Sequence, residues 1–365
     1  MLRRFEVEGF KNFNKKVVLD FTDVKDYRFN LQCITDNTIA KMVIYGKNSS
    51  GKTNLGLALF DIVSHLTSKH VGDDLYSNYL NADSLRKYCT FRYVFQFDTD
   101  VIDYSYAKNS NREIVFEKVL LNKKALFEID KQSNKYLYDG VRELSNTINL
   151  EMQDVDSVLK YLISNTVLEA DHPLRKLNNY VNHMLWIRSL GTERYIGYKT
   201  DSKDYYSFIF EKNNLAEFQQ FLYRAGVMDE LAAKRTPEGD KRLYIRKAKL
   251  LPFRSAASNG TKALYTFFYW YKTSPEVSLL FIDEFDAFYH YELSESIVAL
   301  LEQMSNTQVI LTSHNTNLLT NRIMRPDCYY VLSNNRITSV ARATSRELRE
   351  GHNLEKLYKS GEFDV

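Results

Sequence analysis

One eight-residue pattern constrains this chain of 365 residues more than any other feature. Residues 46–53, GKNSSGKT, match GxxxxGK[ST], in which glycines let the backbone curl so that its N–H groups point at phosphate oxygens. An apolar run at 42–45 precedes this P-loop, and residues 53–66 after it carry apolar side chains at helical spacing. A strand, a phosphate-holding loop and a helix in succession predict an α/β fold with a nucleotide site.

The residue types of the P-loop each suit one contact with a nucleotide. We expect Lys52 to neutralise the β- and γ-phosphates of ATP and the hydroxyl of Thr53 to bind Mg²⁺. The N-terminus of the helix that follows favours the same anion. The predicted nucleotide contacts in this stretch are Gly46, Asn48, Ser50, Gly51, Lys52, Thr53 and Asn54.

A pair of adjacent acids about 230 residues downstream supplies the second half of the expected chemistry. Residues 277–282 form an almost continuous apolar run, as in a strand buried on both faces of a parallel sheet, and Asp283 and Glu284 follow it. Hydrolysis of ATP needs one carboxylate near Mg²⁺ and another that orients the attacking water. We therefore assign Asp283 to the metal and Glu284 to the water; two solvated acids at a strand end are the alternative.

Two further segments complete the predicted site. Residues 309–311 read as another buried strand, and His314 after it is placed to donate a hydrogen bond to the γ-phosphate, a structural histidine being the alternative. Ser258 and Gly260 precede an apolar segment at helical spacing, so they read as the start of a helix. Taken alone, that second segment is only a helix cap.

In this order the motifs resemble those of ABC-type ATPases of the OLD, RecF and SMC-like group. More narrowly, they resemble the compact AAA-family ATPases of bacterial abortive-infection and antiphage systems, in which an acid and a histidine, here Asp286 and His290, follow the acid pair. The resemblance covers roughly residues 1–130 and 243–365. It implies an ABC-ATPase head: a P-loop fold with a mixed sheet and an N-terminal antiparallel β part, which the alternating runs at 5–7 and 17–21 begin as a hairpin.

The same resemblance implies that Ser258 and Gly260 complete the ATP site of an opposite protomer. The stretch departs from the usual signature at Ala257 and Asn259. Gln96 is a weak candidate for the Q-loop, because its surroundings also read as an antiparallel strand.

The predicted organisation is an N-terminal ATPase half at 1–130, an inserted helical lobe at 131–242 and a C-terminal ATPase half at 243–365. Residues 154–164, 172–187 and 215–231 have helical spacing and little glycine, and no sustained heptads indicate a long coiled coil. In the related proteins such an insertion carries a partner or sensor surface; a helical cap without a partner is the alternative.

Composition limits the partners and the compartment. The net charge of +3, from 49 basic and 46 acidic residues, is too small to predict nucleic-acid binding by itself, although it leaves DNA open as a partner. Three distant cysteines form no CxxC pair, and no apolar stretch approaches the ~20 residues that span a bilayer. We expect a cytoplasmic protein with no membrane partner.

The resemblance to PARIS, Septu and related two-component systems implies an ATPase that forms a dimer or larger homo-oligomer around ATP. It would regulate a separately encoded effector, a nuclease or toxin, in antiphage defence. About fifty residues follow His314, so we expect no Toprim nuclease in this chain. Two alternatives stay open: a RecF- or SMC-like ATPase that clamps DNA for repair, and a scaffold that binds ATP but hydrolyses it slowly.

Overall fold

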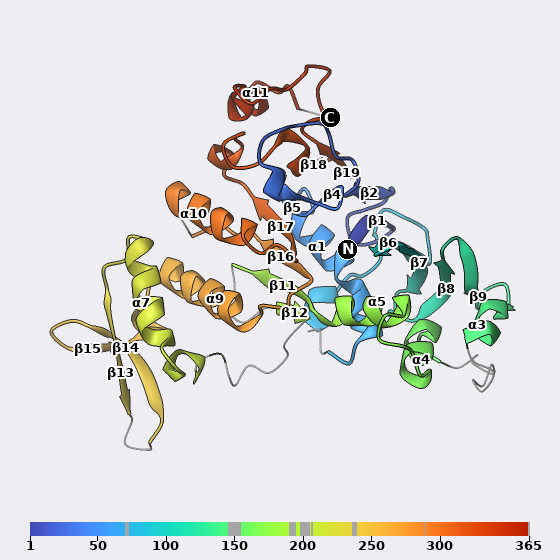
Figure 1. Ribbon diagram of the computed structural model, residues 1–365, viewed down its shortest axis with the longest axis horizontal. Helices are drawn as coiled ribbons and strands as arrows, with labels where there is room; N and C mark the ends of the chain where they lie inside the picture. The colour runs from blue at the N-terminus through green and yellow to red at the C-terminus, as the bar shows by residue number, and fades with distance from the viewer. Residues whose placement is uncertain are drawn as a thin grey trace.

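The computed structural model describes residues 1–69, 73–144, 155–189, 195–197, 205, 207–235, 239–288 and 290–363. Two seven-stranded sheets and a smaller three-stranded sheet organise this part of the chain (Figure 1). The antiparallel sheet lies on one side of the molecule and the three-stranded sheet on the other, with the mixed sheet between them (Figure 1).

The mixed sheet has the strand order β12-β11-β16-β17-β5-β18-β19. Its five inner strands are parallel and its two edge strands are antiparallel to their neighbours. The carboxyl ends of the inner strands therefore meet at one edge, where α/β sheets bind ligands. The strands are β5 (Lys41–Tyr45), β11 (Met184–Arg188), β12 (Tyr195–Gly197), β16 (Leu279–Asp283), β17 (Gln308–Ser313), β18 (Tyr329–Ser333) and β19 (Arg336–Ser339).

The second large sheet is antiparallel throughout, in the order β10-β9-β8-β7-β6-β1-β2. The predicted N-terminal hairpin is confirmed, since Phe5 pairs with Leu19 and Val7 with Val17. The strands are β1 (Leu2–Glu8), β2 (Val17–Asp20), β6 (Tyr88–Phe97), β7 (Asp100–Asn109), β8 (Ile114–Leu121), β9 (Lys124–Asp130) and β10 (Lys135–Leu137).

Helix α1 (Lys52–Leu59) lies between the two large sheets and joins their cores. A Cβ atom on Gly56 would lie 2.7 Å from both the Phe281 ring and Trp186 Nε1, so only glycine lets α1 approach the mixed sheet this closely. On the side of the antiparallel sheet, the hydroxyl of Tyr93 donates to the carbonyl oxygen of Ala58 at 3.0 Å. The P-loop helix is thus held from both sides.

Helices α9 (Asn259–Thr273) and α10 (Tyr291–Glu302) pack against the mixed sheet, where Phe267 and Leu301 line a small cavity together with Leu280 and Ile282 of β16. The remaining helices are α2 (Asp61–Leu66), α3 (Asp139–Leu144), α4 (Val158–Asn165), α5 (Pro173–Asn182), α7 (Asn214–Arg224), α8 (Phe253–Ala256) and α11 (Leu354–Lys359). The short strands are β3 (Ile34–Thr35) and β4 (Thr38–Ile39), and the three-stranded sheet contains β13 (Glu230–Arg235), β14 (Lys241–Arg246) and β15 (Leu250–Pro252).

Residues 131–242 are not helical throughout, and here the structure corrects the prediction. The expected helix over 172–187 ends at Asn182, and Met184–Arg188 is instead strand β11 of the mixed sheet, paired with β16. The expected helix over 215–231 ends at Arg224, after which Gly226 adopts φ +79° and strand β13 begins at Glu230. The mixed sheet therefore takes two strands, β11 and β12, from the segment predicted to be an insertion.

Within the residues that the structure describes, every helix is too short or too polar to span a bilayer.

Candidate nucleotide-binding site

The P-loop makes a tight turn between β5 and α1 that depends on its glycines. Gly51 has φ +102°, and a Cβ atom there would lie 2.4 Å from the side-chain amide of Asn12. A Cβ atom on Gly46 would lie 2.5 Å from Ser50 Oγ. Ser49 also adopts a left-handed conformation, with φ +63°, which few residues other than glycine adopt without strain. The chain curls here as a phosphate-holding loop requires.

Lys52 lies inside this curl. Its Nζ donates to the carbonyl oxygens of Gly46 at 2.7 Å and Lys47 at 3.3 Å, and it lies 3.5 Å from His314 Nδ1. Burial lowers the pKa of Lys52, while the charges of the nearby acids favour its protonated form. The structure therefore brings together two predicted site residues that are 262 positions apart in the sequence.

Asp283 joins the P-loop helix to strand β17. Its two carboxylate oxygens accept hydrogen bonds from Thr53 Oγ1 at 2.7 Å and from Thr312 Oγ1 at 2.8 Å. The side chain is fully buried, and burial raises its pKa, which the two hydroxyl donors partly oppose. The two predicted metal ligands, Thr53 and Asp283, thus lie in direct contact at the carboxyl edge of the mixed sheet.

Glu284 has an unusual backbone conformation, with φ +52°. Its N–H donates to Thr312 Oγ1 at 2.7 Å, which holds the turn after β16 in place. Such left-handed conformations in residues other than glycine cluster at functional sites, where surrounding contacts hold them. Glu284 therefore begins a constrained turn directly after the buried Asp283.

Arg188 is a site residue that the sequence analysis missed. It ends strand β11, and its guanidinium lies 3.4 Å from Glu284 Oε2 and 3.6 Å from Asp283 Oδ2. Its only sequence signal is a charged residue at the end of the apolar run 184–187, and that run read as helix. One cation therefore faces both members of the acid pair.

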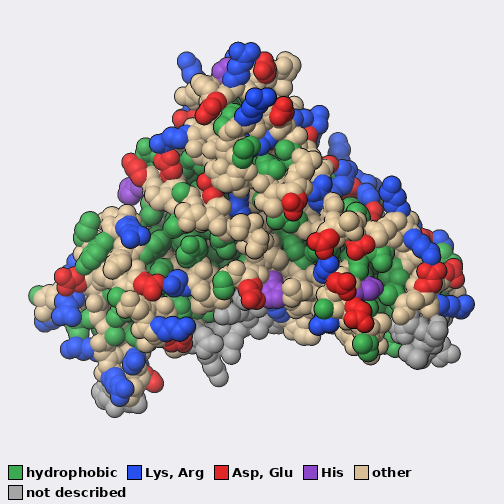
Figure 2. Space-filling view, viewed as in Figure 1, with side chains coloured by type: hydrophobic (Ala, Val, Ile, Leu, Met, Phe, Trp, Pro, Cys, Tyr) green, Lys and Arg blue, Asp and Glu red, His purple; other side chains and the backbone are tan. Residues whose placement is uncertain are grey.

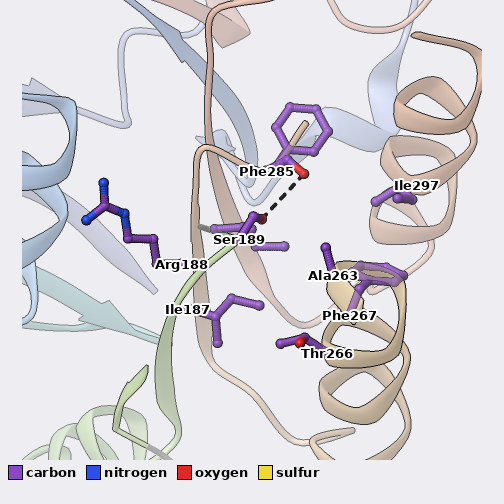
Figure 3. A pocket seen from close by; sticks show the side chains of 9 residues that line it. Ile187, Arg188, Ser189, Ala263, Thr266, Phe267, Phe285 and Ile297 are labelled. Atoms are coloured by element: carbon purple, nitrogen blue, oxygen red, sulfur yellow. Dashed lines mark hydrogen bonds between the residues drawn. The ribbon is translucent and has the colours of Figure 1, made fainter. Parts of the chain in front are cut away.

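Behind Arg188, a small cavity separates the end of β11 from helices α9 and α10 (Figure 3). Ile187 and Ser189 approach it from β11, and Ala263 and Phe267 from α9, while the guanidinium of Arg188 extends away from it (Figure 3). Ser189 Oγ donates to the carbonyl oxygen of Phe285 at 3.4 Å. The cavity volume is about 10 Å³, too small for a nucleotide, so this space belongs to the packing of the acid-pair turn against α9.

Three further predicted residues follow strands β16 and β17: Asp286, His290 and His314. His314 is exposed, and both partial burial and the charge of Lys52 lower its pKa. Asp286 accepts from Ser313 Oγ at 2.6 Å, and burial raises the pKa of its carboxyl group. His290 instead caps α10 and is exposed.

The turn of the N-terminal hairpin also reaches the P-loop. Asn54 Nδ2 donates to Asn12 Oδ1 at 2.7 Å, and Asn12 Nδ2 donates to the carbonyl oxygen of Ser50 at 3.5 Å. Asn335 at the β18–β19 turn lies 3.4 Å from Asn12. Asn12 lies between the two runs predicted to form the hairpin, and nothing in the sequence near it indicates the contact with residue 54.

Ser258 and Gly260 lie at the start of helix α9. Ser258 is the exposed N-cap of α9, and its Oγ accepts from the N–H of Thr261 at 3.1 Å. A Cβ atom on Gly260 would lie 3.0 Å from the carbonyl oxygen of Phe288, so this helix start lies beside the loop that follows the acid pair. Of the other predicted residues, Asn48 is exposed on the P-loop, and Gln96 lies in antiparallel strand β6, donating to the carbonyl oxygen of Asp98.

The residues at this edge fit a nucleotide with Mg²⁺. Among the described residues, Ser50 Oγ is buried on the P-loop and has no hydrogen-bond partner, so it is available to a ligand oxygen. A hydroxyl and a carboxylate, here of Thr53 and Asp283, are oxygen ligands of the kind Mg²⁺ takes. Within the described ranges, no group of three or more His, Cys, Asp or Glu side chains converges as a metal site. The donor set therefore suits a cation that also takes ligands from phosphate and water.

A parallel sheet with a P-loop after one inner strand and an acid pair after another, beside an antiparallel sheet, defines an ABC-type ATPase head of the α/β class. Residues 41–320 match the family described as "AAA domain, putative AbiEii toxin, Type IV TA system". The chain belongs to this family, and the predicted fold class is confirmed.

Comparison with solved structures finds SMC head domains. The SMC head domain from Thermotoga maritima has 16% identity and a TM-score of 0.43, covering 93% of this chain and 98% of that one. An Smc head domain with a coiled coil and joint from Pyrococcus yayanosii has 11% identity and a TM-score of 0.47, covering 93% and 96%. An SMC head bound to the C-winged helix domain of ScpA has 15% identity and a TM-score of 0.44, covering 93% and 97%. No curated protein sequence matches the chain.

Proposed function

We propose that this chain binds ATP with Mg²⁺ at the carboxyl edge of the mixed sheet and hydrolyses it. The observation that carries the proposal is the contact between Thr53 and Asp283 at 2.7 Å, with Glu284 next to them on a turn held by Thr312. Bound Mg²⁺ would neutralise phosphate charge. Thr53 and Asp283 would hold it, and Lys52 with the P-loop N–H groups would hold the phosphates.

Glu284 is the residue we assign to the attacking water. Asp283 accepts a hydrogen bond from Thr53 on the P-loop helix, whereas Glu284 follows it on a left-handed turn, and we assign the two acids different roles. Arg188, 3.4 Å from the Glu284 carboxylate, would orient that side chain, and the exposed His314 beside Lys52 would donate to the γ-phosphate. A positioned general base typically accelerates a reaction by about 10²–10⁴-fold.

We further propose that two or more copies share each ATP. Ser258 and Gly260 lie at the start of α9, where Ser258 is exposed, and an exposed helix start fits a role in the site of a second copy. Closure around ATP would then change how a separately encoded effector is held or released. Antiphage defence is the setting that the sequence resemblance gives, and the segment 131–242 outside β11 and β12 is the part proposed to face a partner.

The test is the Glu284→Gln variant, because it keeps the size of the side chain and removes the charge. Hydrolysis is expected to fall about 10²–10⁴-fold with ATP affinity retained, and native mass measured with ATP and Mg²⁺ is expected to show a stable oligomer. Glu292→Gln, an exposed acid in the first turn of α10, is the matched control. Unchanged hydrolysis in Glu284→Gln would contradict the assignment.

Co-expression with the protein encoded next to this chain tests the regulatory part. An ATP-dependent complex of the two is expected. If the chain instead purifies alone and binds duplex DNA only with ATP, the DNA-clamping alternative replaces it.

A further inference from the structure

The three-stranded sheet concentrates positive charge that the rest of the chain does not have. Residues 230–254 contain eight Lys or Arg against three Asp or Glu, a net charge of +5, while the whole chain carries +3. The rest of the protein is therefore slightly acidic. Basic side chains gather over β13 and β14 at the lower left of the surface (Figure 2).

The register of β13 and β14 places like charges opposite each other. Lys234 pairs with Arg242, and Arg235 pairs with Lys241. All four side chains are exposed, and no carboxylate in the described ranges forms an ion pair with any of them. Like charges directly opposite on two strands destabilise a sheet. Such an arrangement is favourable when a polyanion neutralises it.

The other end of the same sheet is neutralised within the chain. Arg246 lies 3.7 Å from Glu230, and Lys247 lies 2.6 Å from Asp229. Among the described residues, ion pairs therefore form at one end of this small sheet and not at the end that carries the four cations.

A groove adjoins these four cations and has a different character. Its volume is about 690 Å³, within the range of pockets that hold small organic groups. Most of its lining is apolar or aromatic, and cations stand among it. The aromatic members are Phe210, Phe253 and Tyr265, and the cationic members are Lys241, Arg242 and Arg254.

We propose that β13, β14 and this groove form a docking surface for single-stranded nucleic acid. Successive side chains of a strand point to opposite faces, so Lys234 and Arg242 lie on one face of the sheet and Arg235 and Lys241 on the other. The three cations that line the groove would therefore contact the phosphates. An unstacked base would enter the groove against its aromatic wall, the combination by which proteins bind single strands. A duplex keeps its bases stacked inside, so it would use the cations and leave the groove empty. Lys241 and Arg242 line the groove and also belong to the four, which makes the two features one surface.

The surface is next to the helix start assigned above to a second copy's ATP. Strand β15 ends at Pro252, α8 follows directly, and Ser258 caps α9 two residues after α8 ends. A bound strand would therefore contact the segment that positions Ser258. This coupling rests on the proposed function, whereas the binding itself does not.

The experiment measures binding of a fluorescent 20-nucleotide single-stranded DNA by anisotropy, without ATP, over a range of salt concentrations. Three phosphate contacts predict a slope of log affinity against log salt of about −2, since each contact on a single strand contributes about −0.7. In Lys241→Glu/Arg242→Glu the slope should fall to about a third, and the affinity should fall at least about tenfold. The matched control is Lys123→Glu/Lys124→Glu, the same charge change at the exposed β8–β9 turn, which should bind as the wild type does.

A second variant tests the groove separately from the charge. Phe210→Ala should weaken single-strand binding about tenfold and leave the salt slope unchanged, because it removes stacking and no cation. The proposal would be overturned if the oligonucleotide did not bind at low salt. It would also be overturned if Lys241→Glu/Arg242→Glu and Lys123→Glu/Lys124→Glu lost equal affinity for it. If duplex DNA or polyglutamate bound as tightly as the single strand, and Phe210→Ala did not change that binding, the surface would bind anions in general and the proposal would be overturned. An ATPase-inactive protein that still binds the oligonucleotide would refute only the proposed function.

Discussion

The buried ion pair between Asp61 and Lys108 allows a stability prediction with a definite size. Lys108 Nζ lies 2.7 Å from Asp61 Oδ2, and the two side chains are 2% and 1% exposed. The hydroxyls of Tyr79 and Tyr106 donate to the same carboxylate at 2.6 Å and 2.9 Å. The group fastens α2, which directly follows the P-loop helix, to strand β7 of the antiparallel sheet.

Lys108→Met should lower the free energy of unfolding by about 3 kcal/mol. Removing one partner of a buried pair typically costs about 3–5 kcal/mol, because the other charge stays buried without compensation. The lower end of this range applies because Tyr79 and Tyr106 still donate to the Asp61 carboxylate in the variant. Each hydrogen bond to a charged group contributes about 1.5–3 kcal/mol. The double variant Asp61→Asn/Lys108→Met removes both charges and should lose less than Lys108→Met alone.

Urea unfolding followed by circular dichroism at neutral pH measures these differences. The matched control is Lys124→Met, which breaks an exposed ion pair with Glu143 and should lose no more than about 1 kcal/mol. The reasoning is refuted if Lys108→Met loses no more than this control. It is also refuted if the double variant is less stable than Lys108→Met.

Three further predictions concern the candidate site and strand β5, which leads into the P-loop. Lys52→Ala should weaken ATP binding roughly 10- to 100-fold, since it removes charge-assisted hydrogen bonds to phosphate; calorimetric titration measures this, and retained affinity would contradict the role of the lysine. Arg188→Ala should slow hydrolysis roughly 10- to 100-fold with little change in ATP affinity, because the Glu284 carboxylate loses its partner at 3.4 Å. Arg188→Lys should recover part of the rate of hydrolysis. A full rate in Arg188→Ala would exclude a positioning role for Arg188. Burial lowers the pKa of Lys41 to about 8, so the unfolded chain binds more protons than the folded one between about pH 8 and 10.5. The wild type should therefore gain stability relative to Lys41→Met as the pH rises through that window in urea unfolding, and a constant difference would refute this.

The parts of the fold that are predictable from sequence are those in which a local pattern has only one reading. The P-loop requires a strand before it, which predicts β5 where it occurs. The apolar runs at 279–282 and 309–311 end in polar residues, which predicts β16 and β17 where they occur. Their adjacency in the sheet follows from the chemistry, since the P-loop lysine, the acid pair and His314 have to meet at one edge. The alternating runs near the N-terminus likewise specified the hairpin of β1 and β2.

Strand β11 shows where local pattern fails. Leu177, Val181 and Leu185 keep a spacing of four residues, so the helical period runs without interruption from α5 into the strand. What makes Met184–Arg188 extended is its pairing with β16, a partner about 95 positions away. Arg188 comes to lie beside Asp283 and Glu284 only through that pairing. Because the segment was predicted to be helical, Arg188 was not predicted as a site residue.

The hydrogen bonds around Thr312 connect the parts of the candidate site. Thr312 donates to Asp283 at 2.8 Å and accepts from the N–H of Glu284 at 2.7 Å, while Asp283 also accepts from Thr53 on the P-loop helix. Any ligand that draws Thr53 or Asp283 toward itself therefore changes the turn on which Glu284 sits. The loop after that turn reaches Phe288, whose carbonyl oxygen lies beside Gly260 at the start of α9. A continuous set of contacts thus leads from the P-loop to the exposed helix start assigned to a second copy, and from there along α8 to the basic sheet. If both assignments hold, ATP at one end and nucleic acid at the other act on the same helix.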